Sequence, residues 1–154
     1  MKQITNYIEE ALHLNKDSGK NKYTCQPKDK KELKSIIKKR LETNKDADLN
    51  DIDVSNVTSM TYLFDGLDPH KIDISEWNVS NVKWMTSMFN GCENFNSDLS
   101  NWDVSKVKDM AGMFFGCKKF NSDLSNWNVS NVKNMFEMFV NCRLLKNKPS
   151  WYKK

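Results

Sequence analysis

The feature that most constrains this chain is a 25-residue repeat that occurs four times without a change of spacing. A motif of the form Asp/Asn-Val-Ser-Asn/Lys-Val begins at Asp53, Asn78, Asp103 and Asn128. A fixed period of roughly 20 to 50 residues is typical of units that bury their apolar faces by stacking on one another. We therefore expect a solenoid in which the four copies share one continuous core.

Each copy contains a segment whose apolar spacing predicts a helix. Val82, Met85, Met88 and Phe89 fall at i, i+3, i+6 and i+7, which places them on one face of a helix. Gly91 follows, and glycine commonly ends a helix in the left-handed conformation. The other copies repeat this pattern, with Asn141 in place of glycine in the last one.

A second segment in each copy predicts a short strand. Asp98-Leu-Ser100 alternates polar and apolar residues over too few positions for a helix, as do Asp73-Ile-Ser75 and Asp123-Leu-Ser125. The expected fold class is therefore an α/β solenoid, a leucine-rich-repeat-like stack of four strand-helix coils with a helical N-terminal cap. The strands of successive copies would form a narrow parallel sheet.

The residues that flank the repeats predict a cap at each end of the stack. Residues 1–46 should form a helical N-terminal cap, with amphipathic helices at about 2–14 and 29–43. The first of these lacks the uninterrupted apolar run of an export signal, so we do not expect a signal peptide. Residues 47–142 form the repeats, and residues 143–154, with Pro149 and terminal lysines, form a C-terminal cap.

The repeated residues resemble the BspA-like leucine-rich repeats. The resemblance rests on Asp-Val-Ser-Asn-Val, then Met-x-x-Met-Phe-x-Gly-Cys, then Phe-Asn-x-Asp-Leu-Ser-x-Trp, and it covers residues 47–142. Members of that family occur in bacterial surface proteins, mycoplasma lipoproteins and gut bacteriophages, mainly as adhesins and binding surfaces without a shared enzymatic activity. The resemblance implies a protein-interaction solenoid. A short helical start before a few repeats is similar to the copies of crAss-like gut phages, which implies a phage-encoded protein.

The cysteines and histidines do not form a catalytic or metal-binding motif in the sequence. Cys92, Cys117 and Cys142 share one repeat column with Leu67, so we interpret that column as a small buried apolar site. Whether these cysteines ever oxidise is left open. Asp and Asn interchange at the start of the repeated motif, which a turn accepts and an acid–base catalyst does not. We therefore expect no catalytic residue, no metal, no cofactor and no enzymatic activity.

Candidate binding residues lie where the four copies disagree. Most copies carry polar or small residues at these positions, so the fold does not require apolar side chains there. Aromatic residues are enriched at interface hot spots, which favours a binding surface. The alternative is that each of these residues packs against a neighbouring helix or the N-terminal cap. The candidate protein-binding residues are Tyr62, Trp84, Phe115, Phe136 and Val140.

Positive charge is concentrated before the repeats. Residues 1–47 hold twelve Lys and Arg against seven Asp and Glu, and the expected helix at 28–40 is basic. Lys31, Lys34 and Lys38 are candidate phosphate-binding residues, which would suit a nucleic-acid-associated protein. The alternative is a solvated helix face, because Glu32 interrupts the basic run.

These observations favour a non-enzymatic protein–protein interaction module whose protein partner is unknown. The first alternative is a structural or self-assembling component of a particle, since solenoids are open-ended. The second alternative is nucleic-acid binding through the basic helix. No run of apolar residues is long enough to insert into a membrane. We expect the protein in the cytoplasm of the producing or infected cell, or in a virion.

Overall fold

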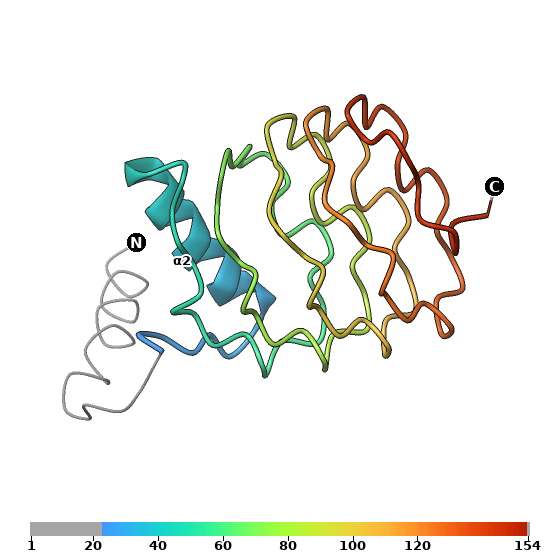
Figure 1. Ribbon diagram of the computed structural model, residues 1–154. Coiled ribbons are helices and arrows are strands. Elements are labelled where there is room, and N and C mark those ends of the chain that lie inside the picture. The colour runs from blue at the N-terminus through green and yellow to red at the C-terminus, as the bar shows by residue number, and fades with distance from the viewer. Residues whose placement is uncertain (1–22, 154) are drawn as a thin grey trace.

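The computed structural model describes residues 23–153 of the chain (Figure 1). The amphipathic helix expected at about 2–14 lies outside these residues. Helix α2 (Lys30–Thr43) lies at one end, and the repeats stack side by side away from it toward the C-terminus at the other end (Figure 1). We number the repeat units 1 to 4, and they begin at Asp53, Asn78, Asp103 and Asn128.

Helix α2 begins at a well-formed N-cap and covers the first repeat unit. The Asp29 side chain accepts a hydrogen bond from the Glu32 amide at 2.9 Å, and the Glu32 carboxylate accepts one from the Lys28 amide at 2.9 Å. This reciprocal arrangement satisfies two amides that a helix start leaves unpaired. The apolar stripe that predicted the helix is buried, and it comprises Leu33, Ile36, Ile37 and Leu41.

The expected α/β solenoid of four strand-helix coils is wrong. Among residues 23–153, α2 is the only helix, and strand pairing is reduced to isolated β-bridges. The segments expected as repeat helices and those expected as short strands consist of turns and irregular backbone. The longest row of bridges joins Ser59, Trp84, Asp109 and Asn134, which lie in the segments expected to be helical.

Backbone hydrogen bonds explain why these segments are not helices. The amides of Met85, Ser87, Phe89 and Gly91 donate to unit 3, at 2.8 to 2.9 Å. The amides of Met88 and Asn90 donate within unit 2 to the carbonyl three residues back, both at 3.2 Å. Ser87 and Gly91 have φ of 51° and 72°, a left-handed backbone that a helix cannot contain. The apolar spacing is helical, but half of the amides are satisfied by the next unit.

The core consists of aromatic columns that run through the stack. Phe114 stacks between Phe89 and Phe139, with ring centroids 5.6 and 5.7 Å away. A parallel column of tryptophans is anchored by hydrogen bonds, since each indole N–H donates to a carbonyl of the preceding unit at 2.9 to 3.0 Å. Trp151 continues this column beyond Trp127, at 6.2 Å between rings. Residues near the C-terminus therefore extend the core.

The repeated Asp and Asn residues form turns, as the sequence predicts. The side-chain oxygens of Asp53, Asn78, Asp103 and Asn128 accept hydrogen bonds from the serine amide two residues later, at 3.0 to 3.2 Å. A second such row forms at Asp73, Asp98 and Asp123. These hydrogen bonds lower the pKa values of Asp73, Asp98, Asp103 and Asp123 below their ordinary value. Both rows are structural.

Candidate functional site

Four of the five candidate binding residues are exposed to solvent. The exposed fraction is 70% for Phe136, 50% for Tyr62, 43% for Trp84 and 38% for Val140, whereas Phe115 is half-buried. All five belong to the segments that form backbone hydrogen bonds between units. Residues 53–152 contain no helix, so packing against repeat helices does not apply. The other part of the alternative, contact with the N-terminal cap, applies to Tyr62, whose carbonyl accepts a hydrogen bond from Lys34 of α2.

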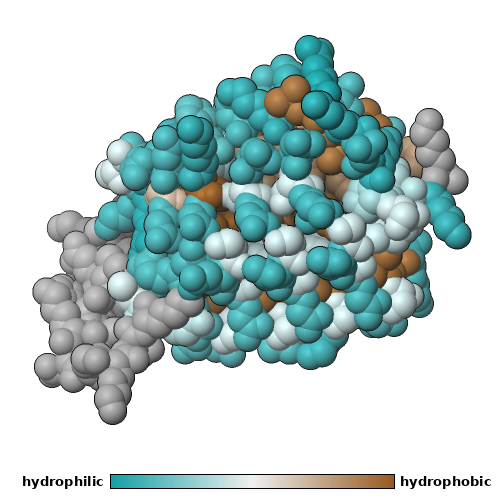
Figure 2. All heavy atoms as spheres, viewed as in Figure 1, coloured by the Kyte–Doolittle hydropathy of each residue, from teal (hydrophilic) through white to brown (hydrophobic). Residues whose placement is uncertain are grey.

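Three of the five, Phe115, Phe136 and Val140, lie on the last two units. Phe115 and Val140 occupy the same column in units 3 and 4, and the Gly116 amide donates to the Val140 carbonyl at 2.8 Å. Phe136 lies four residues before Val140. Figure 2 shows brown, hydrophobic surface near the C-terminal end of the stack, together with smaller brown areas along the rest of this face. We call Phe115, Phe136 and Val140 the apolar patch.

Leu144 is a residue that the sequence reasoning missed. It is 54% exposed and lies on unit 4, four residues after Val140. The other copies carry Pro69, Asn94 and Lys119 in this column, so an apolar residue is unusual there. A comparison of the copies outside the expected helices would have found it.

Tyr62 and Trp84 lie on the first two units, away from the apolar patch. The Tyr62 carbonyl accepts a hydrogen bond from Lys34 on α2 at 2.8 Å. Trp84 is bridged to Ser59 on one side and to Asp109 on the other. The five candidates therefore do not form one continuous surface.

The candidate phosphate-binding lysines have different environments. Lys34 holds α2 against unit 1, because its ammonium group donates to the carbonyls of Tyr62 and Asp65 at 2.8 and 3.1 Å. Lys31 and Lys38 are exposed on the same helix. The structure thus assigns Lys34 to the contact between α2 and the repeats.

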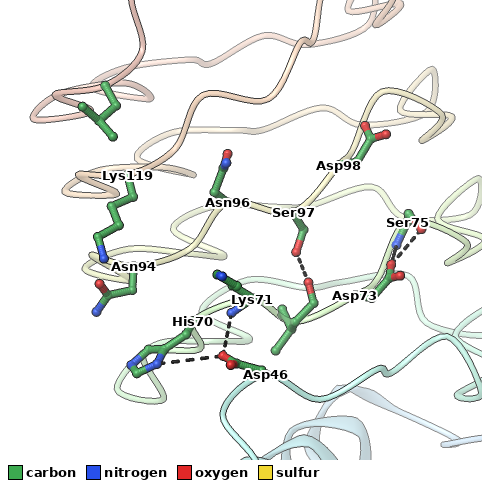
Figure 3. Close-up of a pocket in the computed structure, with 12 residues that line it drawn as sticks. Asp46, His70, Lys71, Asp73, Ser75, Asn94, Asn96, Ser97, Asp98 and Lys119 are labelled. Carbon is green, nitrogen blue, oxygen red and sulfur yellow. Dashed lines mark hydrogen bonds and ion pairs between the residues drawn. The ribbon is translucent and has the colours of Figure 1, made fainter.

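A polar groove of about 720 Å³ crosses the loops of the four units, from Asp46, before unit 1, to Leu144 in unit 4 (Figure 3). Its side chains interact mainly with each other. Asp46 accepts a hydrogen bond from the Lys71 amide at 3.2 Å and lies 3.9 Å from the His70 imidazole, a partner that sequence reasoning did not assign. The Ser97 hydroxyl donates to the Ile72 carbonyl. These contacts join neighbouring units and leave no serine nucleophile hydrogen-bonded to His70.

The three cysteines of the repeat column form hydrogen bonds that join neighbouring units. Cys117 and Cys142 each donate from Sγ to a phenylalanine carbonyl of the preceding unit at 3.0 Å, and Cys92 does so at 3.5 Å. Burial raises the pKa of the Cys92 thiol to about 12 and that of Cys142 to about 11, and it also raises the pKa of Cys117. All three are free thiols.

Residues 23–153 contain no group of three or more His, Cys, Asp or Glu side chains placed to hold a metal ion. Within the same residues, no helix has the length and hydrophobicity that a membrane crossing requires.

Comparison with known proteins identifies a family but not a function. The family model described as "Mycoplasma protein of unknown function, DUF285" matches residues 31–152, which include all of α2 except its first residue and all four repeat units. No curated protein matches the chain, and no solved structure does.

Proposed function

This chain belongs to the DUF285 family, and we propose that it is a BspA-like, non-enzymatic module that binds a protein partner. The family description supplies no activity, so the proposal rests on the surface of the molecule itself. A fold alone does not identify a function.

The apolar patch is the observation that supports this proposal. Phe136 is 70% exposed and Val140 is 38% exposed, and both lie in unit 4. The equivalent positions of units 1 and 2 carry Thr61 and Thr86, and Asp65 and Asn90, which shows that folding does not need large apolar side chains there. Large apolar residues grouped on a surface commonly mark an interaction site.

The two alternatives have less support. Head-to-tail self-assembly would require the N-terminal end of the stack to be accessible, whereas α2 packs against unit 1 through four buried residues and Lys34. Nucleic-acid binding through α2 would lack Lys34, because its ammonium group is already bonded to two carbonyls.

The test uses the tagged full-length chain to capture partners from cells of its source. A partner found by mass spectrometry is then purified and titrated with the wild type and with a Phe136→Ser, Val140→Ser variant. We expect the variant to bind at least about tenfold more weakly, as is typical when hot-spot residues are removed. The matched control replaces an exposed polar residue of the same unit, Lys133→Ser, and should bind like the wild type.

Equal affinity of the wild type and the Phe136→Ser, Val140→Ser variant for every captured partner would contradict the proposal. Thermal unfolding of both variants shows whether the repeats remain folded. Exposed substitutions of this kind typically change stability by less than about 0.5 kcal/mol.

A further inference from the structure

Three lysines stand one above the other along one side of the stack. Lys83, Lys108 and Lys133 occupy the same position in units 2, 3 and 4. Their backbones are directly bonded, because the Lys108 amide donates to the Lys83 carbonyl at 2.8 Å and the Lys133 amide donates to the Lys108 carbonyl at 2.9 Å. Chains bonded in this way lie about 4.8 Å apart. We call Lys83, Lys108 and Lys133 the lysine column.

The lysine column is exposed, and its charges are not paired. None of its three ammonium groups has a hydrogen-bond or ion-pair partner among residues 23–153. Elsewhere neighbouring units pair opposite charges, as Lys118 of unit 3 does with Glu93 of unit 2 at 2.6 Å. Like charges on neighbouring chains destabilise a fold. Unit 1 carries Thr58 in this column, so folding does not require a lysine there.

One carboxylate, that of Asp109, lies next to the column in the chain, but it is engaged elsewhere. Its Oδ1 atom accepts hydrogen bonds from the Thr86 hydroxyl and the Ala111 amide, both at 2.9 Å. Its Oδ2 atom accepts one from the Asn134 side chain at 3.1 Å. Lys106 adds another exposed ammonium group to the same segment. The surface therefore keeps a positive charge, and an anion from outside the chain can reach all three lysines of the column.

An exposed indole ring lies beside the lysine column. Trp84 follows Lys83 in the chain and is 43% exposed. It is bridged to Ser59 and Asp109 of the neighbouring units, and unit 4 carries Asn134 in the same place. Most copies are polar there, so the core does not require this ring. A flat aromatic face attracts the partly positive C–H groups of a sugar ring.

We propose that the lysine column binds an extended acidic polysaccharide, whose carboxylates pair with Lys83, Lys108 and Lys133 while one sugar ring packs on Trp84. When such a polymer carries one carboxylate on each sugar, its charges repeat along its axis at nearly the spacing of the units. Flexible lysine side chains reach carboxylates on either side of the sugar chain. This inference goes beyond the proposed function and does not depend on the apolar patch.

Two other polyanions fit the column less well. Carboxylates on one face of an extended peptide repeat about every 6.8 Å, which does not match the spacing of the units. Surfaces for single-stranded nucleic acid place successive bases on successive aromatic rings. Here only Trp84 is aromatic, because Asp109 and Asn134 occupy the equivalent positions beside Lys108 and Lys133.

The experiment titrates the full-length protein with a short oligogalacturonate and measures the affinity by calorimetry. The control ligand is the same oligosaccharide with its carboxyl groups methyl-esterified, which keeps the sugars and removes the charges. We expect the oligogalacturonate to bind and the esterified form not to bind. Because binding by three lysines releases counterions, the affinity should fall at least about tenfold between about 50 and about 200 mM salt.

Charge variants locate the site. Replacing all three lysines of the column by glutamine should weaken binding of the oligogalacturonate at least about tenfold. The matched control, Lys31→Gln with Lys38→Gln and Lys39→Gln, removes the same charge from exposed positions of α2 and should bind within about twofold of the wild type. Equal loss in the two triple variants would overturn the inference.

Two further readouts separate binding from folding. The variant without the three lysines should be at least as stable as the wild type in thermal unfolding, because the repulsion within the column is removed. Trp84→Ala should weaken binding of the oligogalacturonate about threefold or more. Unchanged affinity in Trp84→Ala would overturn the assigned contact with the sugar ring.

Three other outcomes also overturn the inference. These are absence of oligogalacturonate binding, equally tight binding of the esterified form, and tighter binding of a poly-glutamate peptide or of single-stranded DNA with the same number of charges. The Phe136→Ser, Val140→Ser variant should bind the oligogalacturonate like the wild type. Failure of the polysaccharide test therefore leaves the proposed function standing, and loss of the protein partner in that variant leaves this inference standing.

Discussion

Helix α2 and residues 85–92 bury apolar side chains at almost the same spacing but complete their backbones differently. In α2 the amide of Leu33 donates to Asp29, four residues back in the same element. In residues 85–92, amides donate alternately to the next unit and to the carbonyl three residues back. A helix pairs the backbone amides and carbonyls of its interior residues with each other, whereas a repeat unit needs a neighbouring unit to pair half of its amides.

Local residue types account for this difference. The sequence of α2 is rich in Lys, Glu, Leu and Ile, and it contains no glycine. Residues 85–92 contain Ser87 and Gly91 in the left-handed conformation, together with Thr86 and Asn90. Glycine and small polar residues favour helices less than Lys, Glu and Leu do, and the aromatic columns select the stacked arrangement instead. Stability in the repeats should therefore depend on contacts between units.

The largest effect is expected from Phe114→Ala. The Phe114 ring stacks on Phe89, Phe120 and Phe139 in three different parts of the stack, so its removal leaves a cavity that several units line. We expect the free energy of unfolding to fall by about 3–5 kcal/mol. Urea denaturation measures the change. Phe136→Ala is the control, with an expected change within about 0.5 kcal/mol, and similar losses in the two variants would refute the shared core.

A smaller effect is expected where the two regions meet. Lys34→Ala removes two hydrogen bonds from α2 to the carbonyls of Tyr62 and Asp65. Because Lys34 is only half-buried, we expect a loss of about 1–2 kcal/mol. Lys38→Ala, on the exposed face of α2, should change stability by less than about 0.5 kcal/mol. A Lys34 variant as stable as the Lys38 variant would show that these contacts do not hold the cap.

Glycine substitutions should have opposite effects in the two regions. Lys38→Gly places glycine inside a helix and should cost about 1 kcal/mol. Glu137→Gly relieves a left-handed backbone, φ 56°, and should be neutral or stabilise the protein by up to about 1 kcal/mol. Thermal denaturation of both variants measures the signs. A loss of about 1 kcal/mol in Glu137→Gly would favour a helical repeat segment.

The smallest effect concerns pH and the ion pair that joins α2 to the repeats. Burial by itself raises the pKa of Asp51, but hydrogen bonds from Arg40 and Thr24 outweigh it and hold that pKa below its ordinary value of 3.8. A carboxylate whose pKa is lowered by folding stabilises the folded protein at pH values above its ordinary pKa. This stabilisation is lost as the pH falls through the pKa of the folded state.

The pH test compares the wild type with Asp51→Asn. We expect the free energy of unfolding to fall between about pH 7 and about pH 3 in the wild type, and to fall less in Asp51→Asn. Arg40→Gln removes the guanidinium group that lowers the pKa of Asp51. In this variant, too, the free energy of unfolding should fall less as the pH decreases. An unchanged pH dependence in both variants would show that the pair does not stabilise the junction.

The sequence predicted the repeat, the buried columns, the turn-forming Asp and Asn residues and the helix near 29–43. It did not predict the conformation of the units, because the spacing of Met85, Met88 and Phe89 is common to a helix and to this chain of turns. The two conformations differ in which carbonyl accepts the hydrogen bond from each backbone amide. The spacing of apolar residues within one repeat unit does not indicate hydrogen bonds between units. Ser87 has a left-handed backbone although it is not glycine, so its residue type did not indicate this conformation.

The candidate surface was predicted in part. Disagreement between copies identified Phe136 and Val140, which are exposed, and would have identified Leu144 if every column had been compared. It could not show that the Tyr62 carbonyl accepts a hydrogen bond from Lys34 of α2, or that Trp84 is bridged to Ser59 and Asp109.

The most direct test of the account is amide hydrogen exchange of the free protein, measured residue by residue by NMR. Amides that donate between units, at Met110, Gly112, Phe114 and Gly116, should exchange at least about 100-fold more slowly than those of Glu137 and Asn141. Protection that is continuous through residues 108–116 and equal in unit 4 would instead indicate repeat helices. That result would contradict the claim that each unit is completed by its neighbour.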